Sequence, residues 1–133
     1  MDIEEALTTY LLAQTGLTAL IDRRFSFGDA PQNQALPYVV CITISDVKDH
    51  TLRAQSELEG PVYQLTVYAA TRRAARAVAR QIKAALQDFT GEMSGVKVQY
   101  IQLLNELTST EEIADTRRAH ICDLEFEINY LKE

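Results

Sequence analysis

The periodicity of the sequence changes abruptly between residues 64 and 86. Residues 64–70 alternate in polarity with a period of two, as in a strand, whereas residues 72–86 repeat apolar side chains every three or four positions, as in a helix. Thr71 lies between the two patterns and is a favourable helix N-cap. The sequence therefore predicts a strand at 62–70 that leads directly into a helix with one apolar stripe: Ala75, Val78, Ala79, Ile82 and Leu86.

This helix also concentrates positive charge in an acidic chain. It carries five of the 13 lysines and arginines, while the formal net charge is -6. Spacings of four, four and three residues place most of them on one face. Three interpretations stay open: a solvated face, a nucleic-acid-binding face, or a docking face for acidic groups of a neighbouring copy. The residues are Arg72, Arg73, Arg76, Arg80 and Lys83.

Length and composition limit the possible classes of protein. A chain of 133 residues predicts one domain, 1–133, with a substantial core. It has no apolar run long enough to cross a membrane and no secretory signal, so we expect no membrane partner and synthesis in the cytoplasm. An acidic pI near 4.9 argues against nonspecific nucleic-acid binding by the whole surface.

The first half of the chain contains a helix, an irregular segment and a strand. Asp2 and the apolar spacing that follows predict a helix over residues 3–15, with Gly16 as its C-terminal cap. Glycine, proline and amide residues predict an irregular connection over 25–37. A β-branched run predicts a strand over 38–46, and a polar loop at 47–60 follows it.

The second half predicts two more strands. They are expected at residues 96–104 and 119–130, with a loop at 105–116 between them. In the last strand Asp123, Glu125 and Glu127 alternate with apolar residues and share one face. That face is interpreted as solvated, as an acid-base or hard-cation site, or as a surface facing a partner or channel.

The predicted order is helix, strand, strand, helix, strand, strand. This order favours an α+β fold with a mixed, mostly antiparallel four-stranded sheet and two main helices packed on one face. If the first two strands form a hairpin and the third runs parallel to the second, the loops at 47–60 and 105–116 emerge at opposite ends of the sheet. Candidate partner contacts in the first loop are Lys48, Asp49, His50 and Arg53, and candidate partner-facing carboxylates in the second are Glu106, Glu111, Glu112 and Asp115.

Residues able to carry chemistry are few. Cys41 and Cys122 lie in predicted strands, which favours reduced core cysteines, and with His50 and His120 they match no zinc-ligand spacing. The isolated glycines form neither a Walker loop nor a dinucleotide fingerprint. We therefore expect no metal, no cofactor and no catalytic residues, and a small hydrolase built on the strand carboxylates ranks last.

Several segments together resemble the tail-completion or tail-terminator proteins of long-tailed bacteriophages and prophages. They are residues 3–12, 16–21, 30–32, 36–40, and 64–71 leading into the Ala/Arg helix. The resemblance implies a small α+β subunit in a ring, commonly a hexamer, at the head-proximal end of the tail tube. It implies that the ring ends tube growth and contacts both the tail tube protein and the head connector or head-completion protein.

The resemblance also gives the charged residues possible roles. In a ring through which DNA passes, an acidic lining would keep the duplex from sticking. Either the strand carboxylates or those at 105–116 are candidates for that lining, and the basic helix is a candidate subunit interface. The expected locations are the host cytoplasm during assembly and then the virion. The alternative is a nucleic-acid-binding accessory domain that uses the helix at 71–86.

Overall fold

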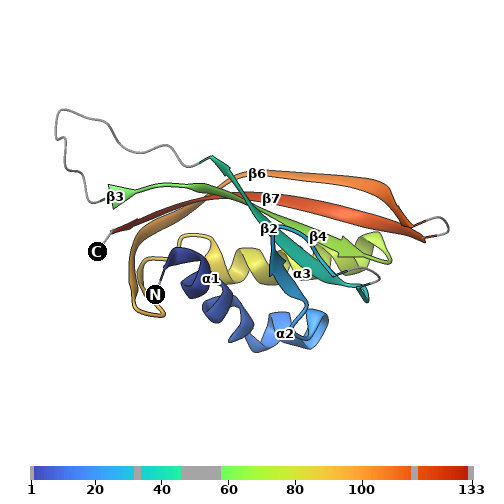
Figure 1. Ribbon diagram of the computed structural model, residues 1–133, viewed down its shortest axis with the longest axis horizontal. Helices are drawn as coiled ribbons and strands as arrows, with labels where there is room; N and C mark the ends of the chain where they lie inside the picture. Colours follow the sequence, from blue (N-terminus) through green and yellow to red (C-terminus); the bar gives the residue numbers. More distant parts are fainter. Residues whose placement is uncertain (1, 32–33, 46–57, 115–116, 132–133) are drawn as a thin grey trace.

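One curved sheet covers three helices, all of which pack on the same face of the sheet (Figure 1). The computed structural model describes residues 2–31, 34–45, 58–114 and 117–131. In chain order the elements are α1 (Ile3–Leu12), α2 (Thr15–Ile21), β1 (Phe25–Phe27), β2 (Tyr38–Ser45), β3 (Leu58–Glu59), β4 (Val62–Ala69), α3 (Arg72–Leu86), β5 (Gly91–Met93), β6 (Val96–Ala114) and β7 (Arg117–Leu131).

The sheet has seven strands, and the last one in sequence lies near its centre. The main order is β1-β2-β4-β7-β6-β5, while β3 pairs with β7 next to the start of β4. Every pair is antiparallel except β1–β2. The predicted α+β class, with helices on one face of a mostly antiparallel sheet, is confirmed. The predicted four strands and two helices in the order α-β-β-α-β-β are not matched in detail. The three short strands were not expected, and α2 is a separate helix where only a short helical turn from Thr18 to Ile21 was expected.

Two of the short strands extend the edges of the sheet. β1 lies in the segment predicted to be irregular, and it pairs in parallel with Val39–Cys41 of β2. β5 forms a tight hairpin with β6, in which Met93 pairs with Val96 across Ser94 and Gly95. Both turn residues have positive φ, 46° and 94°, which is the geometry that a two-residue hairpin requires and that glycine adopts without strain.

The predicted loop at 105–116 is wrong, because β6 continues as a strand to Ala114. Its outer half pairs in register with β7, Thr108 opposite Cys122 and Thr110 opposite His120. Residues 104–112 are all exposed, so no apolar alternation marks this strand in the sequence. Backbone pairing with β7 therefore keeps this segment in a strand conformation, although its sequence pattern is typical of a loop.

The N-terminal helices depart slightly from expectation. Asp2 caps α1 as predicted, since its Oδ1 accepts a hydrogen bond from the Glu5 amide at 2.8 Å. α1 ends at Leu12 instead of residue 15, and Gly16 lies inside α2 instead of capping α1. A Cβ at Gly16 would meet the end of the flexible Gln81 side chain, which shows that this part of α2 lies beside α3.

α3 matches the prediction closely. Thr71 Oγ1 accepts a hydrogen bond from the Ala74 amide at 3.1 Å, and the predicted apolar stripe is buried. This stripe belongs to one core cluster with the inward side chains of β4 and β7, including Leu65, Leu124 and Phe126. None of the helices among the described residues is long and apolar enough to cross a membrane.

Candidate functional site

The sheet face opposite the helices carries the strand carboxylates singled out in the sequence. In β7, Asp123 and Glu125 pair with Thr66 and Gln64 of β4, whereas the alternate residues point into the core. Asp123 Oδ1 accepts a hydrogen bond from Gln64 Nε2 at 3.3 Å, and Glu127 Oε1 accepts one from Asn129 Nδ2 at 3.0 Å. The three carboxylates are therefore half-buried on one face, and two of them, Asp123 and Glu127, accept hydrogen bonds from neutral amide groups.

A fourth carboxylate, Glu111 at the outer part of β6, joins this face. Burial raises the pKa of the Tyr68 hydroxyl, and Glu111, Tyr38 and Asp123 raise it further, which places both carboxylates near that tyrosine. None of the lysines and arginines in the described ranges forms an ion pair with any of the four. We call the set Glu111, Asp123, Glu125 and Glu127 the acidic sheet face.

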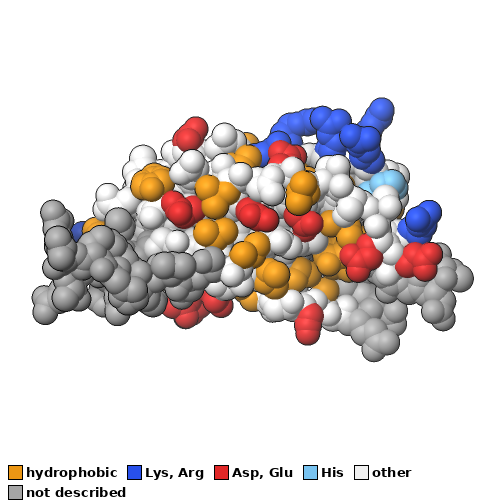
Figure 2. All heavy atoms as spheres, turned by 90° about the horizontal axis from the view of Figure 1, so that it is seen from above, with side chains coloured by type: hydrophobic (Ala, Val, Ile, Leu, Met, Phe, Trp, Pro, Cys, Tyr) orange, Lys and Arg blue, Asp and Glu red, His pale blue; other side chains and the backbone are white. Residues whose placement is uncertain are grey.

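Large apolar side chains are interspersed with these carboxylates. Leu107 is 56% exposed and lies directly opposite Asp123, while Tyr100 is 46% exposed and lies opposite Asn129. Figure 2 looks onto this side of the molecule and shows hydrophobic and acidic side chains mixed over the sheet. Among the described residues, five of the six exposed large hydrophobic side chains lie on β2 and β6: Ile42, Ile44, Tyr100, Leu104 and Leu107.

The basic residues of α3 form a separate surface at the margin of the molecule (Figure 2). The four arginine side chains are exposed, and none of them forms an ion pair within the described part of the chain. We call Arg72, Arg73, Arg76 and Arg80 the basic helix face.

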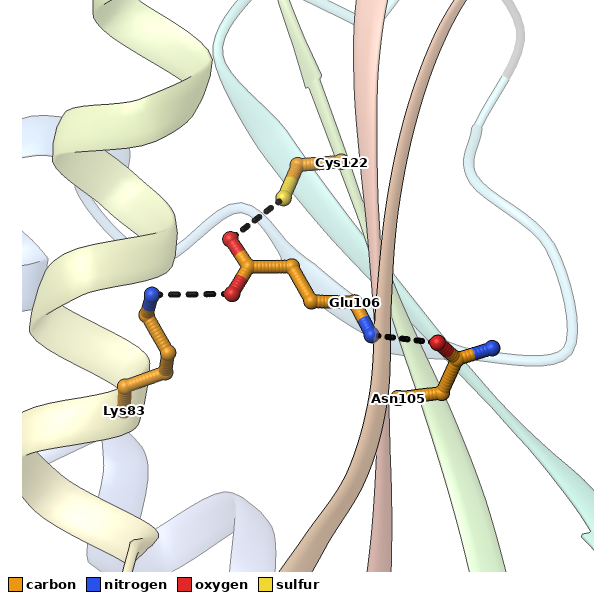
Figure 3. Close-up of polar contacts among 4 residues, drawn as sticks. All are labelled: Lys83, Asn105, Glu106 and Cys122. Carbon is orange, nitrogen blue, oxygen red and sulfur yellow. Dashed lines mark hydrogen bonds and ion pairs between the residues drawn. The ribbon is translucent and has the colours of Figure 1, made fainter.

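Lys83 does not share the environment of the arginines. Its Nζ lies 2.9 Å from Glu106 Oε1, and the Cys122 thiol donates to the other oxygen of Glu106 at 3.7 Å (Figure 3). Glu106 lies opposite Leu124 on the helix side of the sheet, so it does not belong to the acidic sheet face. The structure thus pairs a predicted interface lysine with a predicted partner-facing carboxylate inside one chain.

The two cysteines are buried and free, as the sequence predicts for core residues. Burial raises the pKa of Cys122 to about 11, and the adjacent carboxylate of Glu106 adds to the shift. Burial also raises the pKa of Cys41 strongly. Both thiols therefore stay protonated near neutral pH, which makes them poor nucleophiles and poor metal ligands. Within the described ranges, no group of three His, Cys, Asp or Glu side chains is placed to hold a metal ion.

An open cleft of about 260 Å³ lies between the start of α3 and the outer half of β6. Arg72, Arg76 and His120 line it together with the residues 108–110. Two guanidinium groups, an imidazole and several hydroxyls are suited to hold a carboxylate or a phosphate group. The cleft was not predicted from the sequence, because residues 105–114 were expected to form a loop. The Thr-Ser-Thr run at 108–110 was the signal that could have indicated a strand.

Of the remaining predicted site residues, only Glu112 lies within the described part of the chain. Glu112 is exposed on β6, opposite Arg118. The candidate partner contacts Lys48, Asp49, His50 and Arg53, together with Asp115, lie outside the described residues.

Comparisons with known proteins agree with this architecture. A scan against protein-family models matches residues 5–128 to the family described as Tail completion protein gp17. Among solved structures, the chain is similar to one described as "Virion of native gene transfer agent (GTA) particle", with a TM-score of 0.63 and 20% identity over 98% of each chain. A second is similar over 100% of both chains, with a TM-score of 0.54 and 12% identity. The search among curated proteins found no match.

The two structural matches show that the fold is shared, and the family model shows to which family the chain belongs. The matched range begins in α1 and ends in β7, so it includes α3, the acidic sheet face and the basic helix face. The chain therefore belongs to the family of tail completion proteins, and its role is that of a structural protein of the phage tail.

Proposed function

We propose that this chain forms a ring of six copies, the number that the sequence resemblance implies, and that the ring caps the head-proximal end of the tail tube. The ring ends tube polymerisation and provides the surface to which the head connector or head-completion protein binds. The observation that carries the proposal is the presence of two oppositely charged surfaces on different parts of one chain. Such a pair favours contacts between unlike surfaces of successive copies, which build rings instead of two-fold dimers.

The β6–β7 hairpin supports the joining role. β4 ends at Ala69, opposite His120, so no third strand among the described residues pairs with the hairpin beyond that point. Its exposed carboxylates Glu111 and Glu112 lie on this projecting part. We assign the hairpin to contact with an axial neighbour, either the tail tube protein or the head-side protein, and residues 47–60 to the other neighbour.

Passage of DNA through the ring sets a further condition. Carboxylates that line the channel repel the duplex and keep it mobile. Glu112 and Asp115 are the proposed lining residues. Assembly is proposed to take place in the host cytoplasm before the protein enters the virion.

Particle imaging with and without the protein tests the cap. Overlong tails in its absence, corrected when the protein is supplied, are the expected result for a terminator. Free tails of normal length in its absence would show that the protein joins tails to heads but does not end tube polymerisation. Normal, joined particles in its absence would reject both parts of the proposal.

One observation favours a second function, the binding of nucleic acid by α3. The cleft brings Arg72, Arg76 and His120 together, which suits a phosphate group. A mobility-shift series across salt concentrations distinguishes the two functions. Tight binding that weakens steeply with salt, and that is lost in Arg72→Glu/Arg76→Glu, would favour the nucleic-acid-binding domain. The tail cap predicts no shift with the isolated protein at physiological salt.

A further inference from the structure

We propose that the acidic sheet face of one copy binds the basic helix face of the next copy. This inference rests on the proposed ring and names the surfaces that close it. The occupant of the open sheet is thus a second copy of this chain, bound through α3.

The apolar content of the sheet face argues for protein contact over a channel lining. Leu107, Tyr100 and Ile42 are 56%, 46% and 39% exposed on the same face as the carboxylates, without a covering helix. Apolar side chains concentrated on one face of a soluble protein are typical of an interaction surface. A water-filled channel for DNA requires the carboxylates but gains nothing from the hydrophobic residues. Burial of these side chains therefore supplies the affinity of the contact.

The charges determine which surface binds there. Four carboxylates on the sheet face meet four arginines on the basic helix face, and neither set is neutralised by an ion pair within the described part of the chain. Lys83 is excluded from the contact set because Glu106 already pairs with it. Opposite charges across an interface select the partner and its orientation, while like charges prevent the sheet faces of two copies from stacking on each other.

The placement of the two faces favours a ring over a pair. The acidic sheet face lies on the open side of the sheet, whereas the basic helix face lies at the margin of the molecule (Figure 2). When two copies bind through unlike surfaces, the pair still has one free acidic sheet face and one free basic helix face. A third copy can bind to either through the same contact, and further copies follow until the ring closes.

Two charge-reversal variants and their mixture test the contact. Native mass spectrometry and sedimentation are expected to show wild-type oligomers larger than dimers at protein concentrations up to about 1 mM. Arg76→Glu/Arg80→Glu and Asp123→Lys/Glu125→Lys are each expected to weaken assembly at least about tenfold. A one-to-one mixture of the two variants is expected to assemble again, because alternating copies restore opposite charges at every contact of an even-numbered ring.

Matched controls separate this contact from general effects of charge. Arg23→Glu and Asp29→Lys change the net charge in the same directions at exposed positions outside both faces, and they are expected to assemble like the wild type. Leu107→Ser is expected to weaken assembly, whereas Leu20→Ser, at an exposed position on α2, is not. If the lysine variant fails to fold in a thermal melt, Asp123→Asn/Glu125→Gln takes its place and is expected to weaken assembly.

Three results would overturn the inference. They are a wild-type protein that stays monomeric at about 1 mM, charge-reversal variants that assemble like the wild type, and separately defective variants that do not rescue each other. The last result would show that both surfaces matter without meeting, as expected if the carboxylates line the channel instead. Overlong tails in the absence of the protein, together with any of these results, would leave the proposed cap intact and reject only the contact.

Discussion

Shortening the β6–β7 hairpin separates the stability of the fold from the proposed joining function. The perturbation replaces residues 111–119 by Asn-Gly, so that Thr110 and His120 flank a two-residue turn. Beyond that pair, the described residues of the two strands pair only with each other, because β4 ends opposite His120. Of the side chains described in the removed segment, only that of Ala119 is buried.

The structure predicts a small cost in stability. Loss of the buried Ala119 methyl group costs about 1 kcal/mol, and the shorter connection offsets a few tenths of that. The free energy of unfolding should therefore change by about 1 kcal/mol or less. As a matched comparison, Leu124→Ala removes a fully buried side chain from the central part of the same strand and should cost about 2–5 kcal/mol. The hairpin itself becomes shorter by about 13 Å, since each strand residue spans about 3.3 Å.

Two measurements check the reasoning. Urea denaturation followed by circular dichroism gives the free energy of unfolding of both variants. Imaging of particles made with the shortened protein gives the fraction of tails joined to heads, which we expect to fall sharply. A cost above about 3 kcal/mol would show that the projecting hairpin stabilises the domain. Normal joining by a stable, shortened protein would show that the hairpin does not contact the axial neighbour.

Three further perturbations probe the fold around the proposed surfaces. Thr71→Ala removes the cap of α3 and should cost about 1 kcal/mol in urea denaturation, whereas Thr71→Asp should retain most of the stability. Tyr10→Phe removes the hydroxyl that donates to the Ala85 carbonyl at 2.7 Å and should also cost about 1 kcal/mol, while an unchanged midpoint would mean that water replaces the bond. The pKa of Cys122 is raised to about 11 in the folded protein, so its stabilising contribution is fully present below about 9 and is lost as pH rises through 11. Denaturation midpoints from pH 8 to 11 should fall less steeply in Cys122→Ala, and equal slopes would contradict the assignment.

The features predicted well from the sequence are those encoded by neighbouring residues. Asp2 and Thr71 cap their helices, and the alternation over residues 122–130 gives a strand with one core face and one polar face. In each case the signal lies within a few residues of the structure that it specifies. The same local patterns identify the four arginines of the basic helix face and three of the four carboxylates of the acidic sheet face, but not Glu111.

The features missed depend on contacts between distant parts of the chain. The outer half of β6 is exposed on both faces, so its strand conformation comes from pairing with β7 and leaves no apolar period. The position of β7 between β4 and β6 cannot be read from any one segment. The contact between Lys83 and Glu106 depends on this position of β7 in the sheet. From the sequence, Lys83 was therefore predicted to lie in a subunit interface and Glu106 to face a partner. Gly16 was misassigned because glycine usually marks a helix end, whereas here it lies within the first turn of the short helix α2.

The central position of β7 has a consequence for how the protein is made. Until this strand emerges from the ribosome, β4 and β6 each lack the neighbour that joins them, and the apolar side of the sheet has no continuous core. The N-terminal helices and the first strands can gather early, but the domain closes only when its last strand inserts. Chains cut short before residue 117 would expose two strand edges and remain incomplete. Such a chain would also lack Asp123, Glu125 and Glu127, and so it could not present the acidic sheet face to another copy.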